Sequence, residues 1–276
     1  MQTTRFAEIK DITLDSEKID KIINKARLIG CIVEVVDIGD NNKYCLVSRG
    51  KDCTLYIPDN VETINKDRKC LSLYSNRNMY LTGKLTVVGG KSIETTHKWF
   101  NGCVFSDYDF TKFRADNIED MSSMFENADI TKLNLSGLNM SHVQNAESMF
   151  YMSSINNLVI KGADTRNIKC FDNFISYSNI NKADFENLDT ESAITMKKMF
   201  AYVNIDKLDL RNFKLDNVIS AEAMFEGCRT NTLDIRGLNF SNIKFIRNII
   251  FLQDGKLLTT DNKILEIHKS KLRTGV

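Results

Sequence analysis

The chain lacks most of the sequence features that assign a protein to a chemical class. Its 276 residues include one proline and three histidines, and the formal net charge is only +1. A charge this close to zero gives no argument for a nucleic-acid or membrane partner. No apolar run approaches the ~18 residues of a membrane-spanning helix, and the first residues contain no apolar core of a secretory signal. We therefore expect a soluble, cytoplasmic protein, provided that no signal segment has been removed.

The residue types that carry catalysis and metal binding are also poorly placed. The seven cysteines form no Cys-x-x-Cys pair, and the ligand spacing of a zinc site is absent. His97, His142 and His268 occupy unrelated positions, so no Ser-His-Asp or Cys-His set can be chosen from spacing. Neither Gly-x-Gly-x-x-Gly nor a Gly-Lys-Ser/Thr phosphate loop occurs. We expect a protein that is not an enzyme and has no catalytic residues, metal or cofactor.

The chain instead contains a repeat of 25 residues. An apolar pair recurs at Trp99-Phe100, Met124-Phe125, Met149-Phe150, Phe174-Ile175, Met199-Phe200, Met224-Phe225 and Ile249-Ile250. Other apolar positions keep the same phase, and five residues after the pair come Phe105, Ile130, Ile155, Ile180 and Ile205. A frame kept through six units without insertion or deletion predicts a solenoid, in which each unit is stable only against its neighbours.

Each unit predicts one strand and one short helix. Leu208-x-Leu210 alternates with period two, as in a strand with both leucines on one face. The following apolar positions have the spacing of one helical stripe, as in Val218, Ala221, Met224 and Phe225. Asp216 or Asn217 can cap such a helix, and Gly227 can end it. Because parallel strands need a crossover of this kind, the predicted fold class is α/β, a solenoid of parallel strands backed by short helices.

The repeat resembles a known family. The pattern Ile-x-x-Leu-x-Leu at 130–135 and 205–210 resembles the leucine-rich-repeat strand. The phrases Asn-Met-Ser-His-Val-Gln-Asn-Ala-Glu-Ser-Met-Phe (139–150) and Phe-Glu-Gly-Cys (225–228) resemble the BspA-like subclass found in bacterial surface and lipoprotein arrays. The resemblance covers roughly residues 99–252 and implies a leucine-rich-repeat solenoid.

The repeat departs from that family pattern in two ways. The slot that often holds a ladder asparagine or cysteine is apolar here, at Leu138, Leu188, Phe213 and Leu238, which argues against a buried asparagine ladder. The fourth unit is degenerate, because Ala183 stands where neighbouring units have leucine and Ala163 and Phe171 also break the pattern.

Three parts are predicted along the chain. They are a small α/β domain over 1–95 that also caps the solenoid, the solenoid of six to seven units over 96–252, and a C-terminal cap over 253–276. In the first part we expect a helix over 16–29 and strands over 31–38, 43–48, 53–57, 71–74 and 80–88. A final helix is expected to begin at Thr260 or Asp261. No segment rich in glycine, serine or proline separates the first two parts, so we expect a packed boundary.

Charged side chains form columns on the outward side of the predicted strands. Between the strand leucines of successive units lie Asp109, Asn134, Val159, Asp184, Asp209 and Asp234. Strands lie about 4.8 Å apart, so the last three carboxylates would repel one another unless nearby cations neutralise them. The candidate partner-binding residues are Lys182, Asp184, Lys207, Asp209, Arg211, Asp234 and Arg236. The same pattern would also suit a self-neutralising, solvated face that binds nothing.

These observations favour a non-enzymatic protein-binding scaffold that uses the exposed sheet of a repeat solenoid. An array of this size without a secretion signal fits an intracellular inhibitor of another protein, either host-regulatory or phage-encoded. One alternative is a ligand-binding or enzymatic site in the N-terminal α/β region, near the turns at 39–42 and 49–52. Another is a surface adhesion or structural array, against which the missing signal segment argues.

Overall fold

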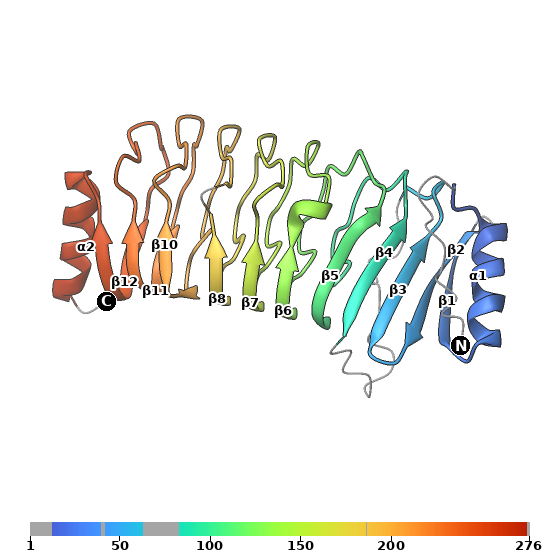
Figure 1. Ribbon diagram of the computed structural model, residues 1–276. Helices are drawn as coiled ribbons and strands as arrows, with labels where there is room; N and C mark the ends of the chain where they lie inside the picture. The colour runs from blue at the N-terminus through green and yellow to red at the C-terminus, as the bar shows by residue number, and fades with distance from the viewer. Residues whose placement is uncertain (1–12, 40–41, 63–82, 186, 275–276) are drawn as a thin grey trace.

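The computed structural model describes residues 13–39, 42–62, 83–185 and 187–274. In these ranges the chain forms a β-solenoid that continues an N-terminal group of strands (Figure 1). The N-terminal elements are α1 (Ser16–Leu28), β1 (Ile32–Gly39), β2 (Asn42–Arg49) and β3 (Asp52–Ile57). The repeat region supplies β4 (Lys84–Gly89), β5 (Val104–Phe113), β6 (Asp129–Asn134), β7 (Ser154–Val159), β8 (Asn179–Asp184), β9 (Asn204–Ile205), β10 (Lys207–Asp209), β11 (Phe225–Asp234) and β12 (Ile250–Leu258). The last element is α2 (Asn262–Thr274).

The strands within the described ranges form one 12-stranded sheet. β1, β2 and β3 pair antiparallel, whereas β3 pairs parallel with β4 and the pairs that follow are also parallel. Equivalent residues of successive units lie side by side, as Ile130, Ile155 and Ile180 do in β6, β7 and β8. This register confirms the predicted parallel sheet and the 25-residue unit.

The prediction of short helices behind the sheet is wrong. In the described part of the repeat region the structure has only the 3₁₀ turn η1 (Leu135–Gly137) beside strands and tight turns. Where helices were expected, alternate backbone N–H groups point to the next turn of the solenoid, as Ser148 donates to the Asp172 carbonyl at 2.8 Å. The residue that follows, Met149, donates within its own turn to the Ala146 carbonyl at 3.2 Å.

Residues with a left-handed backbone conformation allow successive N–H groups to alternate between these two kinds of acceptor. The turns carry residues with positive φ four positions apart, such as Ser148 and Met152, both at 55°. An α-helix would use its N–H groups internally, whereas this backbone directs every second one to a neighbouring turn. The apolar spacing fits either structure, because Val218, Ala221, Met224 and Phe225 are buried here too. Asn217 does not cap a helix but donates from Nδ2 to the Glu191 carbonyl of the preceding turn at 2.8 Å, and Gly227 lies within β11.

A second ladder joins the turns away from the main sheet. One residue from each turn contributes to it through parallel bridges: Thr95, Asp120, Asn145, Cys170, Thr195, Ser220 and Phe245. The exposed side of this row, on the turns from residue 94 to residue 248, is called the ladder face below. The solenoid therefore has two surfaces built from in-register residues, the sheet and the ladder face.

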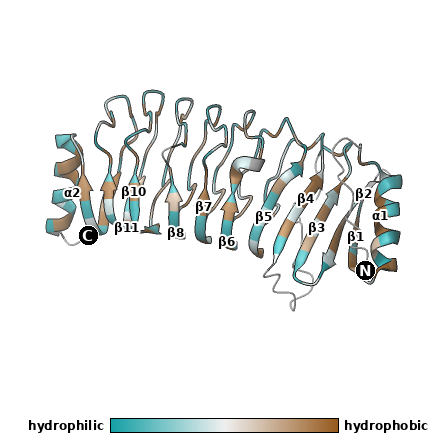
Figure 2. Ribbon diagram, viewed as in Figure 1, coloured by the Kyte–Doolittle hydropathy of each residue, from teal (hydrophilic) through white to brown (hydrophobic). Residues whose placement is uncertain are grey.

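The core is a continuous column of apolar side chains. Phe125 and Phe200, from the repeated pair, have 0% exposed surface. Aromatic rings stack from turn to turn, with centroids 5.6 Å apart for Phe125–Phe150 and for Phe200–Phe225. The slot that could have held a buried asparagine ladder is filled by the buried side chains of Leu138, Leu188, Phe213 and Leu238. Figure 2 shows apolar residues interspersed with polar ones along the strands, which is the alternation that the repeat predicts.

The N-terminal helix α1 lies at one end of the sheet (Figure 1). Asp15 caps it, with Oδ1 accepting from the Lys18 N–H at 2.9 Å, and the helix packs on β1 and β2. The buried carboxylate of Asp59, just after β3, accepts from the Leu14 N–H at 2.5 Å and pairs with Arg114. These contacts tie the start of α1 to the first turns of the solenoid, and the helix predicted over 16–29 is confirmed.

The C-terminal helix α2 lies at the other end and packs on β12 (Figure 1). Asp261 Oδ1 accepts from the Ile264 N–H at 3.0 Å, so the predicted helix start is confirmed. The strand predicted over 71–74, Cys70 and the middle of the predicted turn at 39–42 lie outside the described residues. The division into three parts stays a prediction, and the sheet itself runs without a break in chain order across the boundary at 95.

Candidate protein-binding surface

The seven candidate residues lie on the outward side of the sheet, over β8, β10 and β11. We call this region, with the neighbouring outward residues of β7, the outer sheet face. Lys182 and Asp184 lie on β8, Lys207 and Asp209 on β10, and Asp234 on β11. Arg211 and Arg236 lie two residues after the ends of β10 and β11. Asp209 is paired in register with Asp234, so the structure brings these two carboxylates to neighbouring positions as the column predicts.

Two arginines neutralise these two carboxylates. Arg211 forms a bidentate ion pair with Asp209, in which Nε lies 2.9 Å from Oδ1 and Nη2 lies 2.8 Å from Oδ2. Arg236 pairs with Asp234 in the same way, with Nε 2.9 Å from Oδ1 and Nη2 2.6 Å from Oδ2. Arg211 Nε also lies 3.5 Å from Asp234 Oδ2, which links the two pairs across the strands. Paired two-point contacts of this kind fix both side chains in orientation as well as charge.

The pairs keep both carboxylates ionised. The hydrogen bond from Arg211 lowers the pKa of Asp209, and the hydrogen bond from Arg236 lowers that of Asp234. The Asp234 side chain is only 5% exposed, whereas Arg236 is 50% exposed and Arg211 53% exposed. A partner would therefore meet two oriented guanidinium groups and the Asp209 side chain, which is 31% exposed, whereas the Asp234 carboxylate is buried.

The ladder of the sheet is interrupted beside this cluster. β7 and β8 pair along their length, from Ser154–Asn179 to Val159–Asp184. β8 pairs with β9 only at Asn179 and Ile180, and β10 pairs with β11. No pairing joins Lys182–Asp184 to Lys207–Asp209, although all six of these residues are described (Figure 1).

Two features account for the interruption. Ala183 stands in the slot that Leu158 and Leu208 occupy in the neighbouring turns, so β8 has less apolar volume there to hold it against the core. Asp206, between β9 and β10, directs its carbonyl toward β11, where it accepts from the Asn231 N–H at 2.9 Å and from Thr230 Oγ1 at 3.1 Å. The chain after β9 is therefore held by the following turn of the solenoid and not by the preceding one.

The interruption leaves a hollow of about 400 Å³ in the outer sheet face. Its lining residues are Ala183, Asp184, Phe185, Lys207, Asp209, Arg211 and Asn212. A second hollow of about 370 Å³ adjoins it and shares Ala183, Asp184 and Lys207. Ala183 is half-buried and Phe185 is 3% exposed, so apolar side chains lie below a charged rim. Four of the seven candidate residues, at positions 184, 207, 209 and 211, line the first hollow, and Lys182 lines the second.

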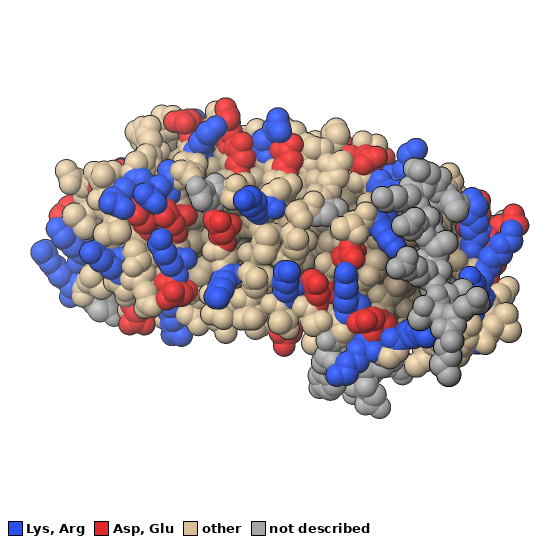
Figure 3. Space-filling view, viewed as in Figure 1, with Lys and Arg blue, Asp and Glu red and all other residues tan. Residues whose placement is uncertain are grey.

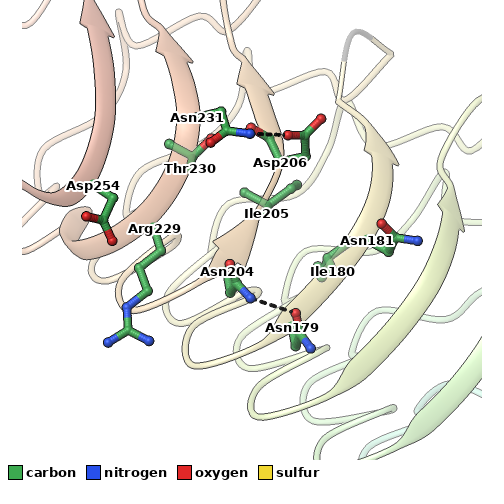
Figure 4. Close-up of a pocket in the computed structure, with 10 residues that line it drawn as sticks. All are labelled: Asn179, Ile180, Asn181, Asn204, Ile205, Asp206, Arg229, Thr230, Asn231 and Asp254. Carbon is green, nitrogen blue, oxygen red and sulfur yellow. Dashed lines mark hydrogen bonds between the residues drawn. The ribbon is translucent and has the colours of Figure 1, made fainter.

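A third hollow, of about 500 Å³, is lined by residues of β8, β9, β11 and β12 and by Asp206 between β9 and β10 (Figure 4). Amide side chains hydrogen-bond across its floor, with Asn204 Nδ2 donating to Asn179 Oδ1 at 3.0 Å and Asn231 Nδ2 donating to Asp206 Oδ1 at 2.6 Å. These side-chain amides still have hydrogen-bond donors and acceptors with which to bind another protein chain. The sequence analysis missed these residues, although their recurrence every 25 positions is a signal that could have found them.

The lysines of the outer sheet face are less engaged than its arginines. Lys207 Nζ lies 3.8 Å from Asp209 Oδ2, a carboxylate that Arg211 already holds. Lys161 and Lys182 are exposed, and the structure gives them no ion pair among the described residues. Figure 3 shows cationic and anionic side chains interleaved over the strands of the repeat region. The face thus combines a neutralised cluster with lysines that remain available to a partner.

The metal-ligating side chains among the described residues are dispersed. Among them, no group of three or more His, Cys, Asp or Glu side chains is placed to hold a metal ion. Cys103 and Cys228 are buried. Burial raises the pKa of Cys45 and Cys228 to about 12, which suppresses the thiolate form at neutral pH. Neither helix in the described ranges has the length and apolarity needed to cross a bilayer.

The repeat region matches a family model described as "Mycoplasma protein of unknown function, DUF285", at residues 71–181 and again at 152–254. Together the two matches run over more than half of the chain. The chain belongs to the DUF285 family. Within the described residues, the two matches include the turns of the solenoid and the 25-residue units. No curated protein and no solved structure matched the chain. The likeness to BspA-like arrays therefore rests on the repeat residues, and the described turns, which contain no α-helix, differ from a helix-backed leucine-rich repeat.

Proposed function

We propose that this protein is a non-enzymatic scaffold that binds another protein on its outer sheet face, over β8 and β10. The observation that carries the proposal is the interruption between these strands, which turns an otherwise regular sheet into a hollow with an apolar floor and a charged rim. Hollows of this kind accept an anchoring side chain of a partner, while the surrounding polar groups set its orientation.

The geometry of the charged rim supports specific binding. Because Asp209 and Arg211 hold each other, neither side chain must be ordered when a partner arrives, and the entropic cost of binding is reduced. Oriented charges at an interface favour complementary partners and reject others through repulsion. The parallel register extends the same surface over successive turns, as in other repeat scaffolds.

Catalysis is not part of the proposal. The ion pairs hold Asp209 and Asp234 in their ionised form, whereas a general acid near neutral pH needs a raised carboxyl pKa. We further propose that binding inhibits the partner and that the protein acts in the cytoplasm. Both statements rest on the sequence alone.

We also propose that the two terminal regions cap the solenoid. α1 covers β1 and β2 with a separate apolar cluster that includes Ile19, Ile23 and Val47. α2 covers β12 with Ile264, which is 1% exposed and belongs to the main core. Covering the terminal strands would protect their edges from pairing with other chains.

An exchange of charges within one ion pair tests the function. The double variant Asp209→Arg/Arg211→Asp keeps an ion pair at the site but inverts its polarity toward a partner. The matched control is Glu191→Lys/Lys214→Glu, which exchanges an exposed pair 2.5 Å apart away from the outer sheet face. Both variants should melt close to the native temperature, because exposed pairs contribute little to stability.

The tagged native chain and both variants are used to capture proteins from the native cell, with quantification by mass spectrometry. We expect at least one protein that the native chain and the control retain and that the Asp209/Arg211 exchange loses. Identical captured sets for all three chains would show that the outer sheet face is not the binding site.

A further inference from the structure

The sides of β8 and β10 that face each other have no strand partner at 182–183 and 207–208 among the described residues. β8 pairs with β7 along its length, but its pairing with β9 on the other side ends at Ile180. In the described sheet β10 pairs with β11 alone. Because successive residues of a strand direct their backbone N–H and C=O groups to alternate sides, both edges present main-chain hydrogen-bonding groups. We call the space between these edges the strand gap.

The strand gap is wider than the spacing of paired strands. The Cα–Cα distances between β8 and β10 exceed 8 Å, with at most two exceptions. In-register Cα atoms of paired strands are about 4.8 Å apart, and those of strands with one strand between them are about 9.6 Å apart. The separation therefore fits one intervening strand better than direct pairing. The three residues of β10 give the gap a length of about 10 Å.

The floor of the strand gap has room for an apolar side chain. Ala183 stands where the neighbouring turns place the buried side chains of Leu158 and Leu208. The hollow of about 400 Å³ is lined by Ala183 and by Phe185, which is 3% exposed. A strand placed here would direct alternate side chains inward and outward. Its inward side chain would meet this apolar floor, and its outward side chains would lie at the charged rim.

We propose that the partner of the outer sheet face inserts an extended segment of about three residues into the strand gap, where it becomes an additional strand of the sheet. The main chain of the segment pairs with β8 on one side and with β10 on the other. Its inward side chain is large and apolar, because Ala183 leaves space where the other turns have a leucine side chain. This inference rests on the proposed function and adds the chemistry by which the partner is held.

The two open edges favour a strand over other occupants. A helix is about 10–12 Å across with its side chains and uses its backbone groups internally, so it would not pair with either edge. A lone anchoring side chain would fill the floor but would leave the main-chain groups of both edges without a strand partner. An added strand does both, since its main-chain bonds supply affinity and the pocket for its inward side chain supplies specificity.

The probe is a synthetic peptide, Ser-Ser-Thr-Leu-Thr-Ser-Ser, with blocked termini. Its central leucine supplies the inward side chain, and the threonines favour an extended backbone. Binding to the isotope-labelled full chain is followed by NMR up to millimolar peptide, so that weak complexes are detected. We expect resonance shifts in residues 182–184 and 207–209, together with slower amide hydrogen exchange there than in the free chain.

N-methylation of the peptide separates insertion from docking on the surface. Each N-methyl group removes one backbone donor. A strand held on both sides uses the N–H groups of successive residues, one toward β8 and the next toward β10. N-methylation of the leucine and N-methylation of the threonine that follows it should therefore each weaken binding about tenfold. N-methylation of the first serine is the matched control and should have no effect.

Two variants of the chain and one of the peptide locate the inward side chain. Ala183→Leu fills the floor and should weaken peptide binding about tenfold without lowering the melting temperature. A peptide with alanine in place of leucine should bind the native chain about tenfold more weakly, which tests the same contact without altering the protein. The control, Lys132→Leu, adds a leucine to the outward side of β6, which is paired with both of its neighbours, and should leave binding unchanged.

The inference is contradicted if the peptide does not bind at millimolar concentration, or if the N-methylated peptides bind as the parent does. It is also contradicted if only one of the two central N-methyl groups weakens binding, because that result indicates pairing with a single edge. If the Asp209/Arg211 exchange still abolishes capture in any of these cases, the proposed function stands and only the insertion falls. If the peptide inserts as described but all three chains capture the same proteins, the proposed function falls, and with it the assignment of the segment to a cellular partner.

Discussion

Replacing Ala183 with leucine tests whether the hollow in the outer sheet face exists. Ala183 occupies a position where the neighbouring turns have leucine, and Leu158 and Leu208 are 1% and 0% exposed. The hollow beside Ala183 measures about 400 Å³, which leaves ample space for a larger side chain. A leucine at this position would restore the regular repeat and fill the floor of the proposed binding site.

The expected change in stability follows from the added apolar surface. The substitution adds three carbon atoms, each worth about 0.8 kcal/mol when fully buried, so the upper limit is about 2 kcal/mol. Because position 183 is only half-buried, we expect a gain of about 1 kcal/mol in the free energy of unfolding. In a packed sheet without a hollow, the same substitution would overpack the core and cost about 1–3 kcal/mol.

Urea denaturation followed by circular dichroism measures this difference, and capture of the partner is measured on the same preparations. Leu158→Ala is the matched control in the adjacent turn and should cost about 2–5 kcal/mol. We expect Ala183→Leu to raise the denaturation midpoint while partner capture falls. A clear loss of stability would refute the hollow, and gained stability with undiminished capture would refute its role in binding.

Three further predictions concern the core and the buried titratable groups. Phe200→Ala, at a fully buried and stacked ring, should cost about 3–5 kcal/mol, and a mild effect in urea denaturation would contradict the stacked core. Burial lowers the pKa of His268 in α2, so its contribution to stability is complete above the unfolded pKa of about 6.5 and is lost as pH falls from there through the lowered folded pKa. Melting temperatures at pH 8 and pH 5.5 should therefore differ less in His268→Leu than in the native chain, and equal differences would contradict this. The thiols of Cys45 and Cys228, with pKa raised to about 12, should resist alkylation by iodoacetamide at pH 8 until the chain unfolds, and peptide mass spectrometry showing rapid labelling would contradict their burial.

The fold could be predicted from the sequence wherever side-chain burial decides it. The repeat sets which residues face inward, and Phe125, Ile155 and Leu208 are all buried as their phase requires. The helices were predicted wrongly because apolar residues three and four apart fit both a helix and a row of tight turns. What separates the two is the backbone at positions such as Ser148 and Lys198, which have positive φ. Serine and lysine have no marked preference for that conformation, so the sequence carries no local signal of it.

The candidate site was only partly predictable for a related reason. Arg211 lies two residues after Asp209, the last residue of β10, so the period-two alternation predicted for this segment places both side chains on one face and predicts their ion pair. The interruption between β8 and β10 depends on how two turns pack against each other. Ala183 is a visible departure from the repeat, yet a small residue can equally be accommodated by a shift of its neighbours.

Hydrogen–deuterium exchange on the complex with the captured partner tests the central claim most directly. The account predicts that the partner slows exchange at the outer sheet face, in residues 182–184 and 207–211, and leaves β1 to β3 unchanged. Slowed exchange in residues 42–57, with unaltered exchange over β8 and β10, would contradict it and place the binding site in the N-terminal region.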